Sequence, residues 1–131
     1  MTILGVADSI YNRDANTFQY NAPGTTFKIF IAPSPMTIVG ISGMPVVVGS
    51  DGGAVTAKFY KCGSGVAAAS GTLLHAGTYD LKGTVDVRQV MVLVTPVSTL
   101  QLNAGDSVAV IFTGTTTAAI GVVQVETEPR N

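Results

Sequence analysis

The chain has 131 residues, enough for one domain that buries a core without help from a disulfide or a metal. Charged residues make up 11% of it, against about 25% in typical globular proteins, and the formal net charge is −1. Nucleic acid is therefore excluded as the main partner, because phosphate binding needs clustered basic side chains. A lone cysteine, Cys62, and a lone histidine, His75, exclude an internal disulfide and a Cys- or His-pair metal site.

No apolar run approaches the roughly 20 residues of a membrane span. The N-terminal residues lack the basic start and apolar stretch of a signal peptide. We therefore expect no membrane partner and no export through a membrane.

Residues 1–25 are polar and show no sustained alternation, and we expect them to form an extended N-terminal arm. Residues 26–131 are expected to form one β-sandwich domain. The alternative for the first segment is an irregular stretch that lies along its own domain. The candidate anchors of an arm are its apolar side chains, with Arg13 as a charged contact; the apolar ones are Ile10, Tyr11, Phe18 and Tyr20. Deleting residues 1–20 is expected to leave a folded domain without its anchor.

From residue 26 onward the pattern is strand, turn, strand. Residues 26–31 alternate, which predicts Phe27, Ile29 and Ile31 on the core face and Phe30 on the opposite face beside Lys28. Phe30 is therefore a candidate oligomer contact. Two short apolar segments follow at 36–42 and 45–48.

Later segments alternate more regularly. Their core-facing residues are predicted to be Val55, Ala57, Phe59, Val108, Val110, Phe112, Val123 and Val125. Residues 84–95 read as the longest strand, with a bulge at Arg88-Gln89 and a central apolar half at 90–94 that is covered on both sides. Residues 103–106 (Asn-Ala-Gly-Asp) read as a tight hairpin connection.

About eight short strands at regular spacing, separated by Gly-rich turns, predict an all-β fold. The expected architecture is an antiparallel β-sandwich, jelly-roll-like, although spacing alone does not determine strand order.

Residues that could carry chemistry are isolated. His75 has no neighbouring nucleophile in a recognisable motif, and Cys62 has no base. The turns at Asp51 and Asp106 carry one carboxylate each, whereas calcium prefers several on one loop. We expect no enzyme activity, no metal and no cofactor.

The second half of the chain contains an ordered set of strand and turn segments. They are 53–61 (GAVTAKFYK), 70–74 (SGTLL), 77–84 (GTYDLKGT), 100–114 (LQLNAGDSVAVIFTG) and 121–125 (GVVQV). Over residues 53–127 this order resembles the small decoration, or cement, proteins on the heads of tailed bacteriophages.

The resemblance implies a structural virion protein. It would be made in the host cytoplasm, form a homo-oligomer (a trimer in the first instance), bind the major capsid protein on the outer surface of the head, and stabilise the capsid by bridging its subunits. Ile10, Tyr11, Arg13, Phe18, Tyr20 and Phe30 are the candidate capsid or oligomer contacts. The alternative is a receptor- or carbohydrate-binding β-sandwich of a phage tail or fibre, and a small enzyme is a weaker third.

Overall fold

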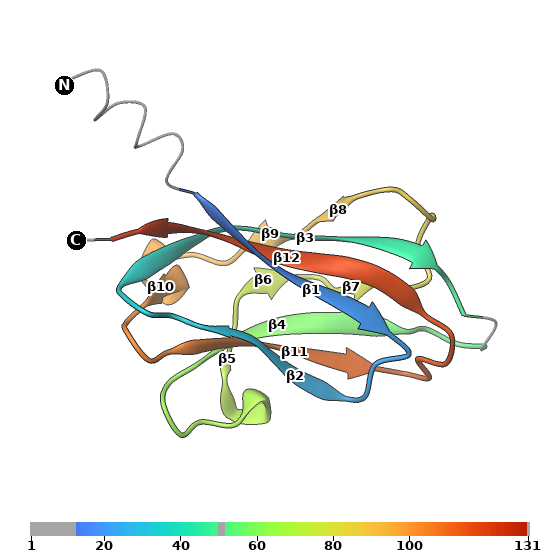
Figure 1. Ribbon diagram of the computed structural model, residues 1–131, viewed down its shortest axis with the longest axis horizontal. Coiled ribbons are helices and arrows are strands. Elements are labelled where there is room, and N and C mark those ends of the chain that lie inside the picture. The colour runs from blue at the N-terminus through green and yellow to red at the C-terminus, as the bar shows by residue number, and fades with distance from the viewer. Residues whose placement is uncertain (1–12, 50–51, 131) are drawn as a thin grey trace, which may run out of the picture.

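The computed structural model describes residues 13–49 and 52–130 and shows two antiparallel sheets that face each other (Figure 1). Sheet A has the order β1 (Asp14–Asn21), β12 (Ile120–Pro129), β3 (Met36–Val47) and β10 (Gln101–Leu102), and β8 (Gln89–Val90) also pairs with β3. Sheet B has the order β2 (Thr26–Ile31), β11 (Ser107–Thr113), β4 (Thr56–Cys62) and β5 (Thr72–Leu73), and β7 (Tyr79–Asp80) also pairs with β4. A third pair joins β6 (His75–Ala76) to β9 (Val92–Leu93).

The strand order is that of a jelly roll. Numbered along the chain, the eight strands on the main paths of the two sheets run 1-8-3-6 in sheet A and 2-7-4-5 in sheet B. The chain changes sheets between β1 and β2, between β2 and β3, between β3 and β4, between β10 and β11, and between β11 and β12, so two Greek keys wind around one core. The all-β sandwich class predicted from the sequence is confirmed.

The core lies between the sheets and follows the predicted alternation of three strands. In β4, β11 and β12 the residues expected to face inward are at most 3% exposed. In β4 and β12 the residues between them are polar or charged apart from Tyr60, and in β11 they are Ala109 and Ile111; all face away from the space between the sheets, as the period of two requires. Alternation therefore placed the buried half of these strands correctly.

Two tyrosines link the sheets through the core. The hydroxyls of Tyr20 on β1 and Tyr79 on β7 are 2.7 Å apart and form a hydrogen bond, which satisfies two buried polar groups. Glycines make room for them. A Cβ on Gly43 would lie 2.6 Å from the Tyr79 ring, and one on Gly121 would overlap the Tyr20 hydroxyl. Glycine in these strands is thus explained by the close approach of an aromatic ring.

A smaller apolar cluster covers the outer face of sheet B. Cys62 and Ala109 pack beneath Ala68 of the short 3-10 helix η1 (Ala68–Ser70). A Cβ on Gly71 would lie 2.9 Å from the Cys62 sulfur, so this segment lies close against the sheet. Cys62 is fully buried and acts as a small apolar residue there.

The first segment differs from the expected arm. Residues Asp14–Asn21 form β1, which pairs with β12 in uniform register and lies along its own domain. Phe18 and Tyr20 recur at the strand period of two, and both contact the core. The proposed domain boundary at residue 25 remains a prediction, because residues 1–12 lie outside the described part of the chain.

Strand β2 corrects the predicted faces of Phe30 and Ile31. A register shift in its pairing with β11 leaves Ile29 as an extra residue between Lys28 and Phe30. After this bulge Phe30 packs against the core, whereas Ile31 is 68% exposed. The alternation predicted through Ile31 is therefore wrong beyond Ile29.

Three other expectations are also wrong. Residues 36–47 form one continuous strand, β3, rather than two short segments. Residues 90–94 are not covered on both sides, since Val90 is 61% and Val92 is 71% exposed. The turn at 103–106 connects β10 in sheet A to β11 in sheet B, so it does not close a hairpin. Ala32, in the connection between β2 and β3, bonds to this turn twice: its amide donates to the Asp106 carbonyl, and its carbonyl accepts from the Gly105 amide.

Candidate interaction surface

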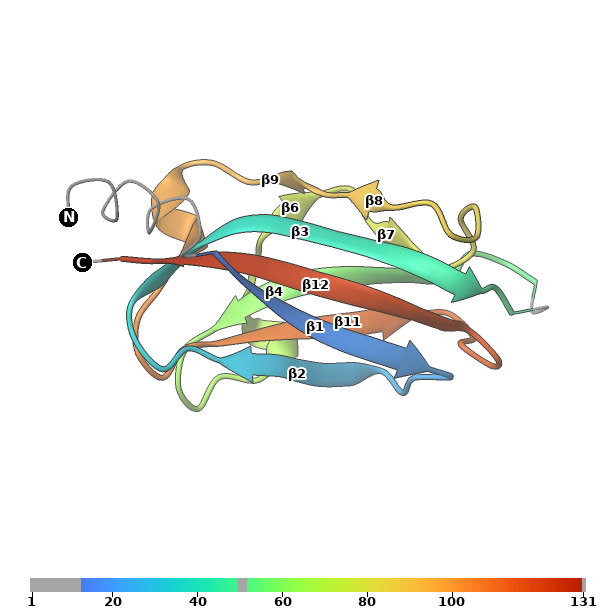
Figure 2. The ribbon, with the colours of Figure 1, turned by 45° about the horizontal axis from the view of Figure 1, so that its top comes forward.

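Exposed valines follow one border of the sandwich, where the segment through β8 and β9 runs along the upper edge of the molecule (Figure 2). They define what we call the valine strip: Val85, Val87, Val90, Val92 and Val97, which are 40%, 51%, 61%, 71% and 59% exposed. Several exposed apolar side chains along one border make this segment a candidate interaction surface.

Backbone hydrogen bonds hold the strip against β3 of sheet A. The Asp86 amide donates to the Pro45 carbonyl at 2.8 Å, and the Met91 amide donates to the Ile41 carbonyl at 2.9 Å. Met91 and Leu93 turn inward to the core, which forces Val90 and Val92 outward. Val46 and Val47, at the end of β3 beside Pro45, are also exposed and extend the apolar surface.

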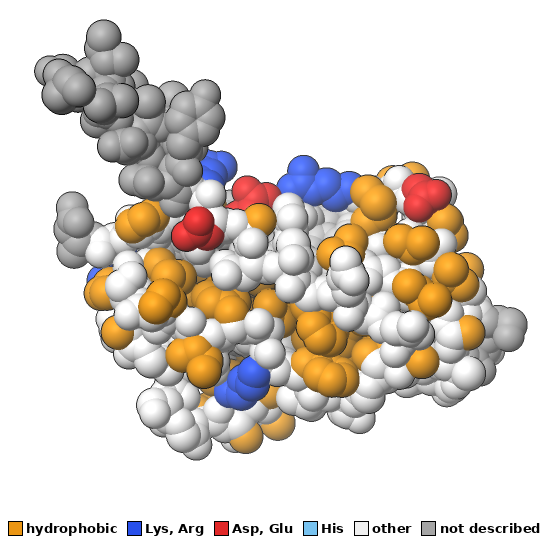
Figure 3. Space-filling model, viewed as in Figure 1, with side chains coloured by type: hydrophobic (Ala, Val, Ile, Leu, Met, Phe, Trp, Pro, Cys, Tyr) orange, Lys and Arg blue, Asp and Glu red, His pale blue; other side chains and the backbone are white. Residues whose placement is uncertain are grey.

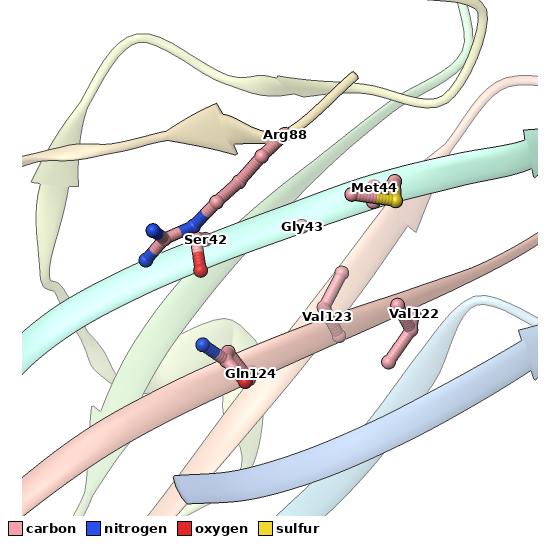
Figure 4. Close-up of a pocket in the computed structure, with 7 residues that line it drawn as sticks. All are labelled: Ser42, Gly43, Met44, Arg88, Val122, Val123 and Gln124. Carbon is pink, nitrogen blue, oxygen red and sulfur yellow. The ribbon is translucent and has the colours of Figure 1, made fainter. Parts of the chain in front are cut away.

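Charge is sparse on the neighbouring sheet face. The surface shown in Figure 3 consists mainly of hydrophobic and uncharged polar side chains, with few charged ones between them. The Arg88 side chain extends from the strip's own segment over β3 (Figure 4), and its guanidinium contacts the Glu126 carboxylate at 3.3 Å. The Gln124 amide donates to the same carboxylate oxygen at 3.2 Å.

A shallow depression lies beneath Arg88. Its volume is about 130 Å³, and its lining comes from β3, β12 and Arg88 (Figure 4): Ser42, Gly43, Met44, Arg88, Val122, Val123 and Gln124. Pockets for drug-sized ligands measure roughly 300–1,000 Å³. No aromatic ring lines the depression to stack against a sugar. It fits a small apolar side chain better than a saccharide.

The predicted contact residues do not gather at one place. Arg13 is exposed and donates to the Glu128 carboxylate at 2.8 Å, and Phe18 is partly buried at the outer edge of sheet A. Tyr20 is 1% exposed, so its prediction as a partner contact is wrong: its ring is part of the core. Phe30 also packs against the core for the reason given above. Ile10 and Tyr11 lie outside the described residues.

His75 serves the fold. It is fully buried, and its Nε2 accepts a hydrogen bond from the Phe59 amide at 3.0 Å. Its Nδ1 lies 3.1 Å from the Ala76 carbonyl, so Nδ1 carries the hydrogen of a neutral ring. Burial lowers the pKa of His75, a hydrogen bond to the Ala76 backbone opposes this, and the charge of Lys58 lowers it further. A neutral, enclosed imidazole bonded to backbone has a structural role.

Within residues 13–49 and 52–130, no group of three or more His, Cys, Asp or Glu side chains is arranged to hold a metal ion. In the same part of the chain, no helix is both long and apolar enough to cross a membrane.

Sequence patterns did not reveal the valine strip. The run Val90-Met91-Val92-Leu93-Val94 reads as buried on both faces because every residue in it is apolar. The usable signal was in the residues before it, where Val85 and Val87 alternate with Asp86 and Arg88. Exposed valines among charged residues are typical of a surface segment rather than of a core strand.

Comparisons with known proteins give little further information. No family model matches the chain, and no curated protein matches it. Among solved structures, the chain is similar to a chain of infectious bursal disease virus strain Gx, with 18% identity over 89% of this chain and a TM-score of 0.33. It is also similar to a chain of strain Gt, with 15% identity over 94% and a TM-score of 0.29. Both are virus structures. The chain spans 30% and 37% of the lengths of those two chains, about a third in each case.

Proposed function

We propose that this chain is a structural virion protein that binds the outer surface of a phage head and stabilises the capsid by bridging major capsid subunits. The observation that carries the proposal is the valine strip, because it offers exposed apolar side chains on a border of the domain that is hydrogen-bonded to β3. The resemblance of residues 53–127 to phage decoration proteins supports the choice of partner. Jelly rolls occur in viral capsid proteins and in lectins, so the fold admits this function without deciding it.

Low charge supports a surface that is covered in the assembled particle. Only 15 of the 131 residues are Lys, Arg, Asp or Glu, and free proteins usually keep more charge for solubility. A capsid-bound oligomer makes several contacts at once, so modest affinities combine through effective concentration. The trimer implied by the resemblance would provide that multivalency.

The proposal is tested by locating the chain and then disrupting the strip. Immunogold electron microscopy of particles that carry the chain should label the heads densely. Quantitative mass spectrometry of the same particles should give hundreds of copies of the chain per particle. Labelling confined to tails would support the receptor-binding alternative, and no labelling would contradict both.

Binding to heads should depend on Val90 and Val92. The variant Val90→Asp/Val92→Asp is expected to remain folded, since both side chains are more than half exposed, and to lose binding in co-sedimentation with heads that lack the chain. The matched control is Ile31→Asp, which places a carboxylate at an equally exposed apolar residue outside the strip. Full binding by the double variant would show that the strip is not the capsid contact.

The carbohydrate-binding alternative is weaker. The depression under Arg88 is small and carries no aromatic platform, and the chain has no tryptophan. Binding of the purified chain to a glycan array would support this alternative, and loss of that binding in Met44→Asp, which fills the depression with charge, would locate the site beneath Arg88.

A further inference from the structure

Strand β1 is the long unprotected edge of the described structure. In sheet A it pairs with β12 on one side, and no other described strand pairs with its second side (Figure 2). It has eight residues, and its register with β12 runs from Asp14 to Asn21 without a shift. Every second residue therefore presents a backbone N–H and C=O to solvent along this edge.

The other sheet edges differ from β1. The strands β5, β7, β8 and β10 have two residues each, too few to pair extensively. β2 has six residues, but it carries the bulge at Ile29 and the charge of Lys28. Short strands, bulges and charges are the features that protect edges from pairing, and β1 has neither a bulge nor a proline. Its single charged residue, Asp14, is at its first position.

We propose that two copies of this chain pair antiparallel through β1, with a two-fold axis at Phe18 that makes sheet A continuous across both molecules. A two-fold axis perpendicular to a sheet keeps each core face on the same side. Residues that face the core must then meet core-facing residues of the second copy, and this limits the register.

The sequence of β1 fits the register centred on Phe18. On the core side, the partly buried Phe18 ring meets its own copy, which covers apolar surface that Phe27 and Phe112 leave open. On the outer side, exposed Thr17 faces Gln19 of the second copy, and both are uncharged. Asp14 falls outside the paired residues 15–21, so no like charges meet.

Nearby charges do not oppose the pairing. The Lys28 ammonium on the neighbouring edge strand β2 is bound by the Ser107 hydroxyl at 2.9 Å and the Val66 carbonyl at 3.0 Å. Arg13, just before β1, is paired with Glu128. The second copy is chosen as the occupant because, in this register, the Phe18 rings of the two edges meet, the facing outer residues are uncharged and no like charges meet.

The inference is independent of the proposed function and of a trimer. A two-fold contact through β1 doubles the number of chains in the assembly: a monomer becomes a dimer, and a trimer becomes a hexamer. Failure of head binding would leave it standing, because the test uses the purified chain alone.

The test uses charge pairs across the axis. In Thr17→Lys/Gln19→Lys, lysines of the two copies face each other twice, and in Thr17→Glu/Gln19→Glu, carboxylates do so. Sedimentation equilibrium should show half the wild-type mass for each variant, with association weakened roughly tenfold or more. Mixing the two variants in equal amounts should restore the wild-type mass, because each lysine then faces a glutamate.

The control is Ser64→Lys/Ala69→Lys, which adds the same two charges at exposed residues. Both residues lie between β4 and β5, in the segment that contains η1, and are far from β1 in the sequence. This control variant should have the same mass in sedimentation equilibrium as the wild type. In the wild type, backbone hydrogen exchange in residues 15–21 should become slower as the protein concentration increases. An identical mass for wild type and both charged variants would overturn the proposal. So would failure of the mixed variants to associate, or concentration-dependent protection elsewhere but not in β1.

Discussion

His75 makes stability depend on pH in a window set by a single residue. The unfolded chain has a histidine pKa of about 6.5, and burial lowers the pKa in the folded protein. The unfolded state therefore binds a proton first as the pH falls. The free energy of unfolding should be highest above about pH 6.5 and should decrease below it, by up to about 1.4 kcal/mol per pH unit, until the folded pKa is passed.

Urea unfolding between about pH 8 and about pH 5 measures this effect. In His75→Gln the amide oxygen can still accept from the Phe59 amide, but the residue does not titrate. The variant should lose the decrease between about pH 6.5 and about pH 5. An unchanged decrease would assign it to another group.

Phe30 and Ile31 form a matched pair of adjacent residues with opposite environments. The sequence places Phe30 outside and Ile31 inside, whereas the bulge at Ile29 reverses them. Phe30→Ser should lower the free energy of unfolding by about 2–3 kcal/mol, because it removes an aromatic ring packed against the core. Ile31→Ser should change it by less than about 0.5 kcal/mol. Chemical denaturation of both variants checks the assignment, and equal effects would contradict it.

At the scale of elements, β1 changes the outcome expected for an N-terminal deletion. Removing residues 1–20 would take away most of β1, expose the edge of β12 that pairs with it and leave the Tyr79 hydroxyl without its partner. We therefore expect this deletion to unfold the protein, contrary to the expectation from sequence. Deletion of residues 1–12 leaves β1 intact and should preserve the cooperative thermal transition. Circular dichroism of the two truncated chains distinguishes these results, and a folded 21–131 chain would show that β1 is dispensable.

Elements were predictable where one periodicity ran unbroken. Phe59, Val110 and Val123 could be placed in the core because their strands alternate along their whole length. The bulge at Ile29 could not be foreseen, since it depends on the register with β11 rather than on β2 itself. The exposure of Val92 depends on the position of its segment at the border of the sandwich. Both features depend on tertiary contacts rather than on local sequence, and for the same reason the valine strip could not be predicted.

The turn at 103–106 shows another limit of local sequence. Its residues specify a tight reversal, with the Asp106 carboxylate accepting from the Asn103 amide at 2.9 Å. Whether the next strand joins the same sheet or the opposite one depends on the tertiary contacts of the turn. Here Ala32 binds both Gly105 and Asp106, which directs β11 into sheet B.

For the whole molecule, low charge predicts weak dependence on salt. Two ion pairs in the described part of the chain, Arg13–Glu128 and Arg88–Glu126, are partly exposed, and such pairs contribute about 0–1 kcal/mol each. Raising NaCl from about 0.05 M to about 0.5 M should change the free energy of unfolding by less than about 1 kcal/mol. A larger change in denaturant titrations would indicate a stronger electrostatic contribution than these contacts provide.

The position of β12 has a consequence for synthesis on the ribosome. β12 lies between β1 and β3, yet it follows every other strand in the sequence. Asp14 pairs with Thr127, so the first described strand waits for almost the whole chain before its neighbour exists. Until β12 is synthesised, β1 and β3 lack the strand that joins them in sheet A, and their apolar side chains are not buried in a complete core. Such distant pairings make folding slow and leave the nascent chain exposed to aggregation, so chaperone binding during translation would matter more for this protein than its size suggests.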